Sequence, residues 1–143
     1  MRLDMQKTEP ESYQAVFALE KYLSKSRLTR THKELIKLRA SQLNGCAYCL
    51  NMHSREARQA GETEQRLYVL SAWREAGDLF TPEERALLAL TEEVTLIGQR
   101  VSDATYAQAA ALFDEQYLAQ AIMAIATINV WNRIAIATEK PLD

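Results

Sequence analysis

The chain has 143 residues, of which 48% are hydrophobic, and it contains only four glycines and three prolines. So few helix-breaking residues exclude collagen-like, low-complexity and turn-rich all-β proteins, and the apolar content excludes a disordered chain. At this length we expect a single domain that covers residues 1–143.

The charge and the N-terminal sequence exclude several classes of partner. A net charge of −2 gives no basic surface, so we expect no nucleic-acid partner. The first residues are charged and lack the apolar segment of a signal peptide. The longest apolar stretch, residues 119–137, is interrupted by polar side chains and does not reach the ~18 apolar residues of a membrane span. We therefore expect no membrane partner and a cytoplasmic protein.

Start and stop signals divide the first part of the chain into three helices. The first, residues 10–26, begins at Pro10 and carries apolar residues at helical spacing. The second, residues 31–44, begins with the Thr31-x-x-Glu34 pattern of a capping box and ends at Gly45. The third follows almost at once and covers residues 46–60.

Four more helices are predicted over residues 63–77, 81–98, 102–113 and 114–138. Thr81, Pro82 and Glu84 combine a capping box with proline at the first helical position, which is a strong start signal. The last segment is apolar nearly all round, which predicts a fully buried helix that a second subunit helps to cover. No segment has a strand pattern. The sequence therefore predicts an all-α bundle of about seven helices.

The residues that carry chemistry lie at the start of the third helix. Cys46 and Cys49 form a Cys-x-x-Cys pair, and His53 follows four residues later. At about 100° per residue the three side chains share one face of the helix. Cys46 lies at the helix N-terminus, where free N–H groups and the helix dipole lower a thiol pKa from ~8.5 into the ~3.5–7.5 range. The pattern predicts a redox pair of thiols with a base beside it.

Glu34 is a possible fourth member of this group. It lies eleven residues before Gly45, so a helical hairpin would bring its carboxylate to about the level of His53. There it could orient the imidazole directly or through a water molecule. The alternative is that Glu34 only completes the capping box that begins at Thr31.

The same residues allow two other interpretations. A structural zinc site needs four ligands, of which Cys46, Cys49 and His53 supply three, and Glu34 or His32 would have to supply the fourth. The two cysteines could instead be small buried apolar side chains.

Other side chains have a simpler structural interpretation. We expect His32 to be solvated, Trp73 and Trp131 to lie in the core, and Tyr48 to lie in the core or at an interface. Three polar residues interrupt the apolar last helix, and they could line a site or bridge subunits because buried polar groups need partners: Asn129, Asn132 and Arg133.

The segment from Glu34 to His53 resembles the core motif of the AhpD-like alkylhydroperoxidases of the carboxymuconolactone decarboxylase superfamily, which is a Glu, then Cys-x-x-Cys, then a His. The resemblance continues over residues 57–62 and 125–133. It implies an AhpD-like helical bundle with a helix-turn-helix active-site hairpin. It also implies assembly into homo-oligomers, as trimers or hexamers, and a cysteine-based peroxidase or disulfide-reductase activity.

Carried over residue by residue, the resemblance implies that Cys49 is the peroxidatic thiol and that Cys46 resolves it by forming a Cys46–Cys49 disulfide. His53 and Glu34 would relay the proton, and no cofactor or metal is implied. The chain departs from AhpD in one position, because Tyr48 stands where AhpD has a His inside the Cys-x-x-Cys. The relay thus has one imidazole fewer.

These observations lead to three hypotheses. The first is an antioxidant enzyme that takes a hydroperoxide as substrate and an external dithiol or thiol as reductant. The second is a thiol–disulfide reductase or a redox sensor that uses the same residues without efficient peroxidase activity. The third is a metal-binding helical module.

Overall fold

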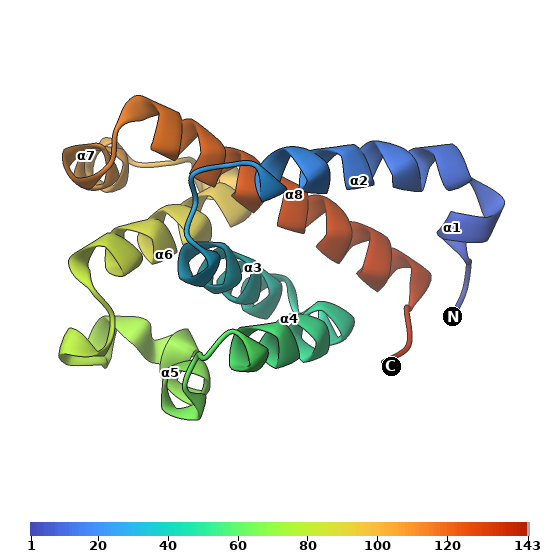
Figure 1. The fold of residues 1–143 in the computed structure, drawn as a ribbon, viewed down its shortest axis with the longest axis horizontal. Helices are drawn as coiled ribbons and strands as arrows, with labels where there is room; N and C mark the ends of the chain where they lie inside the picture. Colours follow the sequence, from blue (N-terminus) through green and yellow to red (C-terminus); the bar gives the residue numbers. More distant parts are fainter. Residues whose placement is uncertain (143) are drawn as a thin grey trace.

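The computed structural model describes residues 1–142, and within them every regular element is helical (Figure 1). Eight α-helices occur in this part of the chain: α1 (Met5–Thr8), α2 (Pro10–Ser24), α3 (Arg30–Asn44), α4 (Ala47–Gln59), α5 (Glu64–Val69), α6 (Pro82–Thr95), α7 (Asp103–Leu112) and α8 (Glu115–Thr138). Three short 3₁₀ segments join them: η1 (Leu70–Glu75), η2 (Gly77–Leu79) and η3 (Ile97–Gln99). The predicted all-α fold is confirmed.

The boundaries differ from the predicted ones in several places. The helix predicted over residues 63–77 is α-helical only to Val69 and continues as 3₁₀ turns, because Ala72 leaves the helical region with φ −115° and ψ 28°. The short helix α1 was not predicted, and it forms because the Asp4 side chain accepts a hydrogen bond from the Lys7 backbone N–H.

The start of α3 also differs, and this difference matters for the site. Thr29, rather than Thr31, is the N-cap, and its hydroxyl accepts a hydrogen bond from the His32 backbone N–H at 3.1 Å. Glu34 therefore lies beyond the capping positions of α3, and its carboxylate is free of the capping role. At Thr81 and Glu84, by contrast, the predicted capping box is present with both of its hydrogen bonds.

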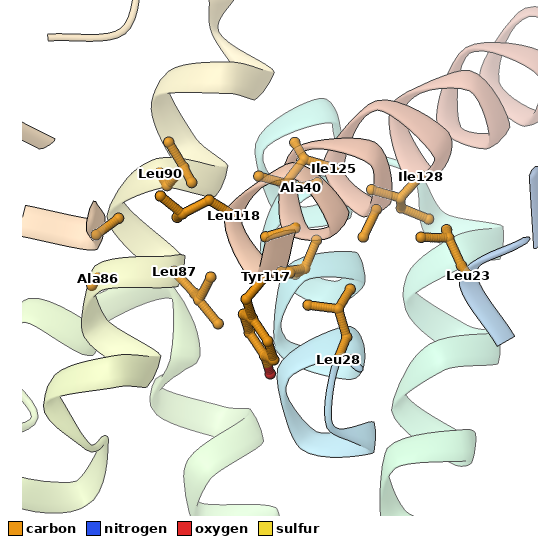
Figure 2. Packing of buried hydrophobic residues seen from close by; sticks show 14 residues of the cluster. Leu23, Leu28, Ala40, Ala86, Leu87, Leu90, Tyr117, Leu118, Ile125 and Ile128 are labelled. Carbon is orange, nitrogen blue, oxygen red and sulfur yellow. The ribbon is translucent and has the colours of Figure 1, made fainter. Parts of the chain in front are cut away.

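The core forms where α3 packs against α6 and α8. Figure 2 shows Ala40 from α3 enclosed by Leu87 and Leu90 from α6 and by Leu118 and Ile125 from α8. Each fully buried Leu or Ile side chain contributes roughly 1.5–3 kcal/mol to folding. A second apolar cluster surrounds Trp73 and connects α3 to η1, as predicted for that tryptophan.

Helix α8 is not fully buried within the single chain, and its cover by a second subunit stays a prediction. It packs against α2, α3 and α6, but Ala126, Ile136 and Ala137 are exposed on its outer side. Among the described residues α8 is the one helix long and apolar enough to cross a membrane, a test that core helices of soluble proteins also pass. Its contacts in the bundle account for its apolar composition.

Two of the three polar residues of α8, Asn129 and Asn132, bridge α8 to α3 rather than line the site. The Asn44 side-chain amide donates to the Oδ1 atoms of Asn129 and Asn132, each at 2.9 Å. Asn132, which is completely buried, donates in turn to the Ser41 hydroxyl at 3.0 Å, and Arg133 donates to Asn129. This network fixes the C-terminal turn of α3 on α8, directly before the cysteine pair.

We expect Asn132→Ala to lower the free energy of unfolding by about 1–3 kcal/mol, because it leaves buried polar groups of α3 without a partner. Urea denaturation measures the change, with Gln108→Ala on the exposed side of α7 as the control. A value within about 0.5 kcal/mol of the wild-type chain, as for an ordinary surface change, would contradict the structural role of this network.

Candidate active site

Gly45 determines how α3 joins α4. It adopts a left-handed conformation with φ 69° and ψ 33°, and the backbone N–H of the next residue, Cys46, bonds to the Ser41 carbonyl at 3.0 Å. Glycine accepts this conformation without a steric penalty, so the chain can end one helix and start the next within two residues. The predicted helix-turn-helix hairpin is present, and α3 packs along α4.

Cys46 is the N-cap of α4. Its Sγ accepts a hydrogen bond from the Cys49 backbone N–H at 3.3 Å. The sulfur thus lies at the positive end of the helix dipole, next to an N–H group that has no partner within the helix. Such a position stabilises a thiolate when the sulfur is reduced.

Cys46 and Cys49 are joined by a disulfide, with the two Cα atoms 5.3 Å apart. Both residues are buried, with exposed fractions of 1% and 2%. Only Cys49 lines the cavity of the site, because it lies among the wall residues and Cys46 does not. The two residues therefore differ: Cys49 lines the cavity, and the Cys46 sulfur caps the helix end.

His53 shares the buried face of α4 with Cys49. Its Nδ1 lies 2.8 Å from Glu56 Oε2 and 3.8 Å from Glu34 Oε2. The predicted approach of Glu34 is confirmed, but the hydrogen-bonded partner is Glu56, which we did not predict. The signal for it was present, because residues three apart on a helix are neighbours. Since a carboxylate can only accept, Nδ1 carries the proton, and Nε2 is left as the basic nitrogen.

The electrostatic surroundings favour the neutral imidazole. Burial lowers the pKa of His53 below its ordinary value, and the ammonium group of Lys37 lowers it further. The hydrogen bond that His53 donates to Glu56 and the charge of Glu34 oppose this shift without reversing it. A neutral imidazole beside a thiol is the form that can act as a base.

Glu34 is held in the interior with one oxygen engaged. Its Oε1 lies 3.5 Å from the Lys37 ammonium, whereas Oε2 is buried and has no hydrogen-bond partner among the described residues. A buried acceptor of this kind costs roughly 1–3 kcal/mol of folding free energy, which indicates a function or a bound water.

Glu34, His53 and Glu56 also place one ligand atom each within 4.8 Å of one another, a set that could hold a metal ion. The Lys37 charge disfavours a second cation there.

His32 does not belong to this site. It was expected to be solvated, but it is half-buried, and its Nδ1 lies 2.7 Å from the Tyr117 hydroxyl. Burial lowers the pKa of this imidazole. The ring packs edge-on against Phe113 and Tyr117, so it cannot complete a zinc site with the cysteines.

A cavity of about 260 Å³ leads to the Cys49 sulfur. Its wall comes from α2, α3, α4 and α8 and from the segments beside them. Tyr48 and Trp131 both line it, so neither is a simple core or interface residue as expected. The other lining residues are Gln6, Tyr13, Phe17, Glu20, Lys37, Met52, His53, Glu56, Ile134, Ala135 and Lys140.

Residues 10–93 match the sequence model of the carboxymuconolactone decarboxylase family. The match covers more than half of the chain and includes Glu34, both cysteines and His53. The chain belongs to this family.

Relatives place the chain in the AhpD-like branch of the family. It is 45% identical to the uncharacterised protein YdfG of Bacillus subtilis over 137 residues, which are 95% of this chain and 92% of YdfG. It is 39% identical to a protein of unknown function from Agrobacterium tumefaciens, described as a candidate antioxidant defence protein AhpD. That structure superimposes with a TM-score of 0.95 and covers 99% of this chain and 97% of its own. The chain is an AhpD-like member of the family.

The same fold occurs in a protein that is named as a debrominase. The debrominase Bmp8 has a TM-score of 0.86 at 19% identity, over 96% of this chain and 74% of its own. This likeness shows the fold alone. Family membership and the bonded Cys46–Cys49 pair together indicate a redox role for this AhpD-like chain.

The surroundings of His53 predict opposite pKa changes in two variants. Glu56→Ala removes a hydrogen bond to the imidazolium, so the pKa of His53 falls further. Lys37→Met removes a neighbouring positive charge, so the pKa of His53 rises. Nuclear magnetic resonance titration of the imidazole in the disulfide form measures both changes. Shifts in the same direction, or no shift in either variant, would contradict the described geometry.

Proposed function

We propose that this AhpD-like chain is an antioxidant peroxidase that reduces hydroperoxides through a Cys46–Cys49 dithiol/disulfide cycle. Glu34 and His53 relay the proton, and Glu56 orients the imidazole. One observation carries the proposal: the disulfide-bonded Cys49 lines a cavity together with His53, whose Nδ1 lies near two carboxylates.

In the first step the reduced Cys49 thiol gives its proton to the basic nitrogen of His53. The resulting thiolate attacks the terminal oxygen of the hydroperoxide, the O–O bond breaks, and Cys49 becomes a sulfenic acid. The alkoxide takes the proton from the imidazolium and leaves as an alcohol. Glu56 and Glu34 stabilise the imidazolium while it exists, as carboxylates do beside a catalytic base.

In the second step the Cys46 thiol gives its proton to His53, which is neutral again, and the resulting thiolate attacks the Cys49 sulfur. The S–O bond breaks, and the hydroxide takes that proton from His53 and leaves as water. The helix end and the Cys49 backbone N–H stabilise the attacking thiolate. In the resulting disulfide the two Cα atoms lie 5.3 Å apart, at the first turn of α4.

In the third step an external dithiol restores the enzyme. One of its thiolates attacks the Cys49 sulfur, which faces the cavity, and Cys46 departs as the stabilised thiolate. The second thiolate of the reductant then attacks its own sulfur in the mixed disulfide and releases Cys49. The reductant leaves oxidised by two electrons, and both cysteines are reduced.

A thiol–disulfide reductase or redox sensor is the second candidate. Tyr48 favours it, because the AhpD pattern has an imidazole at that position and this chain has a phenol. Stopped-flow rates of the reduced protein with a hydroperoxide and with a small disulfide distinguish the two functions. A faster reaction with the hydroperoxide supports the peroxidase.

We further propose a cytoplasmic homo-oligomer, a trimer or a hexamer, that binds neither nucleic acid nor membranes. Exposed apolar side chains on α7 and α8, namely Tyr106, Leu112 and Ile136, would be covered by such an assembly. Sedimentation equilibrium measures the number of subunits.

Substitution of the cysteines tests the cycle. We expect Cys49→Ser to abolish peroxide consumption. Cys46→Ser still forms a sulfenic acid on Cys49, which dimedone traps, but it does not complete the cycle. Peroxide consumption at the wild-type rate by the Cys46→Ser/Cys49→Ser variant would contradict the proposal.

Substitution of His53 tests its role as the base through kcat/KM. We expect His53→Gln to lower kcat/KM by about 10²–10⁴-fold, the usual contribution of a general acid–base group. His32→Gln serves as the matched control, because this imidazole lies against Tyr117 outside the cavity, and we expect its kcat/KM to remain near the wild-type value. Equal losses in the two variants would indicate a stability effect rather than catalysis.

A further inference from the structure

Part of the wall of the cavity that Cys49 lines is aromatic. Tyr13 and Phe17 of α2 and Trp131 of α8 form a contact group with ring centroids 5.2–5.9 Å apart. Phe17 is half exposed, at 50%, although it is apolar. Hydrogen peroxide needs no such surface, whereas an apolar substrate would bury part of it.

One cation of the cavity has no carboxylate partner within residues 1–142. The Lys140 ammonium lies 4.3 Å from the centroid of the Tyr48 ring and 5.9 Å from that of Tyr13. Burial alone would lower the pKa of Lys140, but the hydrogen bonds and charges of the two phenol groups raise it overall. The group therefore stays protonated beside the cavity.

The other charged groups of the cavity are already engaged. Lys37 pairs with the Glu34 carboxylate, and Glu56 is bonded to His53. Glu20 accepts a hydrogen bond from the Trp131 indole N–H at 2.9 Å.

Glu20 and Lys140 are separated along the wall. Tyr13, beside Lys140, precedes Glu20 by seven residues on α2, or about 10 Å along the helix axis. The wall thus has at one end a cation without a carboxylate partner in the described part of the chain, aromatic rings in the middle, and an engaged carboxylate at the other end.

We propose that Lys140 and Tyr48 form the recognition site for a carboxylate on the substrate. The substrate class is then a small organic hydroperoxide that carries a carboxylate on an apolar, aryl or short alkyl body. The aromatic wall binds the body, Lys140 binds the carboxylate, and the peroxide group reaches Cys49. This inference rests on the proposed peroxidase function, and it specifies which hydroperoxides that enzyme prefers.

A matched pair of substrates tests the preference. Cumene hydroperoxide and its para-carboxylate have the same apolar body and differ in one negative charge. We expect kcat/KM to be about tenfold higher for the carboxylate, the low end of what a hydrogen bond to a charged group contributes. The preference should weaken as the salt concentration rises.

Variants assign the preference to Lys140. Lys140→Met should reduce the ratio of the two kcat/KM values to near one, and Lys140→Arg should retain most of it. Lys21→Met, on the exposed side of α2, is the control and should keep the wild-type ratio. Equal kcat/KM values in the wild-type enzyme, or an unchanged ratio in Lys140→Met, would overturn the inference.

A binding measurement separates this inference from the proposed function. Calorimetry with the disulfide form needs no turnover, and 4-isopropylbenzoate and 4-isopropylbenzyl alcohol serve as probes. We expect the benzoate to bind about tenfold more tightly, by the same charged hydrogen bond, and Lys140→Met to remove the difference. If the benzoate binds selectively but no hydroperoxide is reduced, carboxylate recognition holds and the peroxidase proposal fails. If cumene hydroperoxide is reduced but the benzoate shows no preference, the recognition proposal fails and the peroxidase stands.

Discussion

The left-handed turn at Gly45 is the constraint on which the site depends. It ends α3 and allows Cys46 to cap α4 directly, so two helices that carry the chemistry lie side by side with almost no loop between them. One consequence is electrostatic, because the Cys46 sulfur lies at a helix N-terminus. The other is geometric, because the hairpin brings Glu34 of α3 to within 3.8 Å of His53 on α4. The Asn44–Asn132–Ser41 network holds the same turn against α8.

Around His53 the structure places two carboxylates with different surroundings. Glu56 is partly exposed and bonded to the imidazole. Glu34 is buried and paired with Lys37, and one of its oxygens has no hydrogen-bond partner among residues 1–142. In the proposed cycle Glu56 fixes the orientation of the ring, and Glu34 provides the buried end of the proton relay. The arrangement is similar to that of enzymes in which a third group holds the catalytic base in place beside the nucleophile.

Local signals were sufficient to predict the helices and the redox motif from the sequence. The Thr81 capping box, the glycine at position 45 and the Cys46-Cys49-His53 spacing depend on neighbouring residues only. The start of α3, in contrast, depends on residues that are distant in the sequence. The choice between Thr29 and Thr31 as the cap depends on distant partners, because the Thr29 backbone N–H donates to the Tyr117 hydroxyl and that of Arg27 donates to Gln120. The cavity wall depends on tertiary packing for the same reason, so the places of Trp131 and Lys140 could not be predicted from periodicity.

The central claim is that a hydroperoxide converts the two reduced thiols of this AhpD-like protein into the Cys46–Cys49 disulfide. Mass spectrometry during titration of the fully reduced protein with cumene hydroperoxide tests it most directly. The account predicts that one disulfide forms for each hydroperoxide consumed, that peptide mapping assigns it to Cys46 and Cys49, and that one equivalent of a dithiol reverses it. Consumption of the hydroperoxide with both cysteines still reduced, or oxidation of Cys49 only to sulfinic acid, would contradict it.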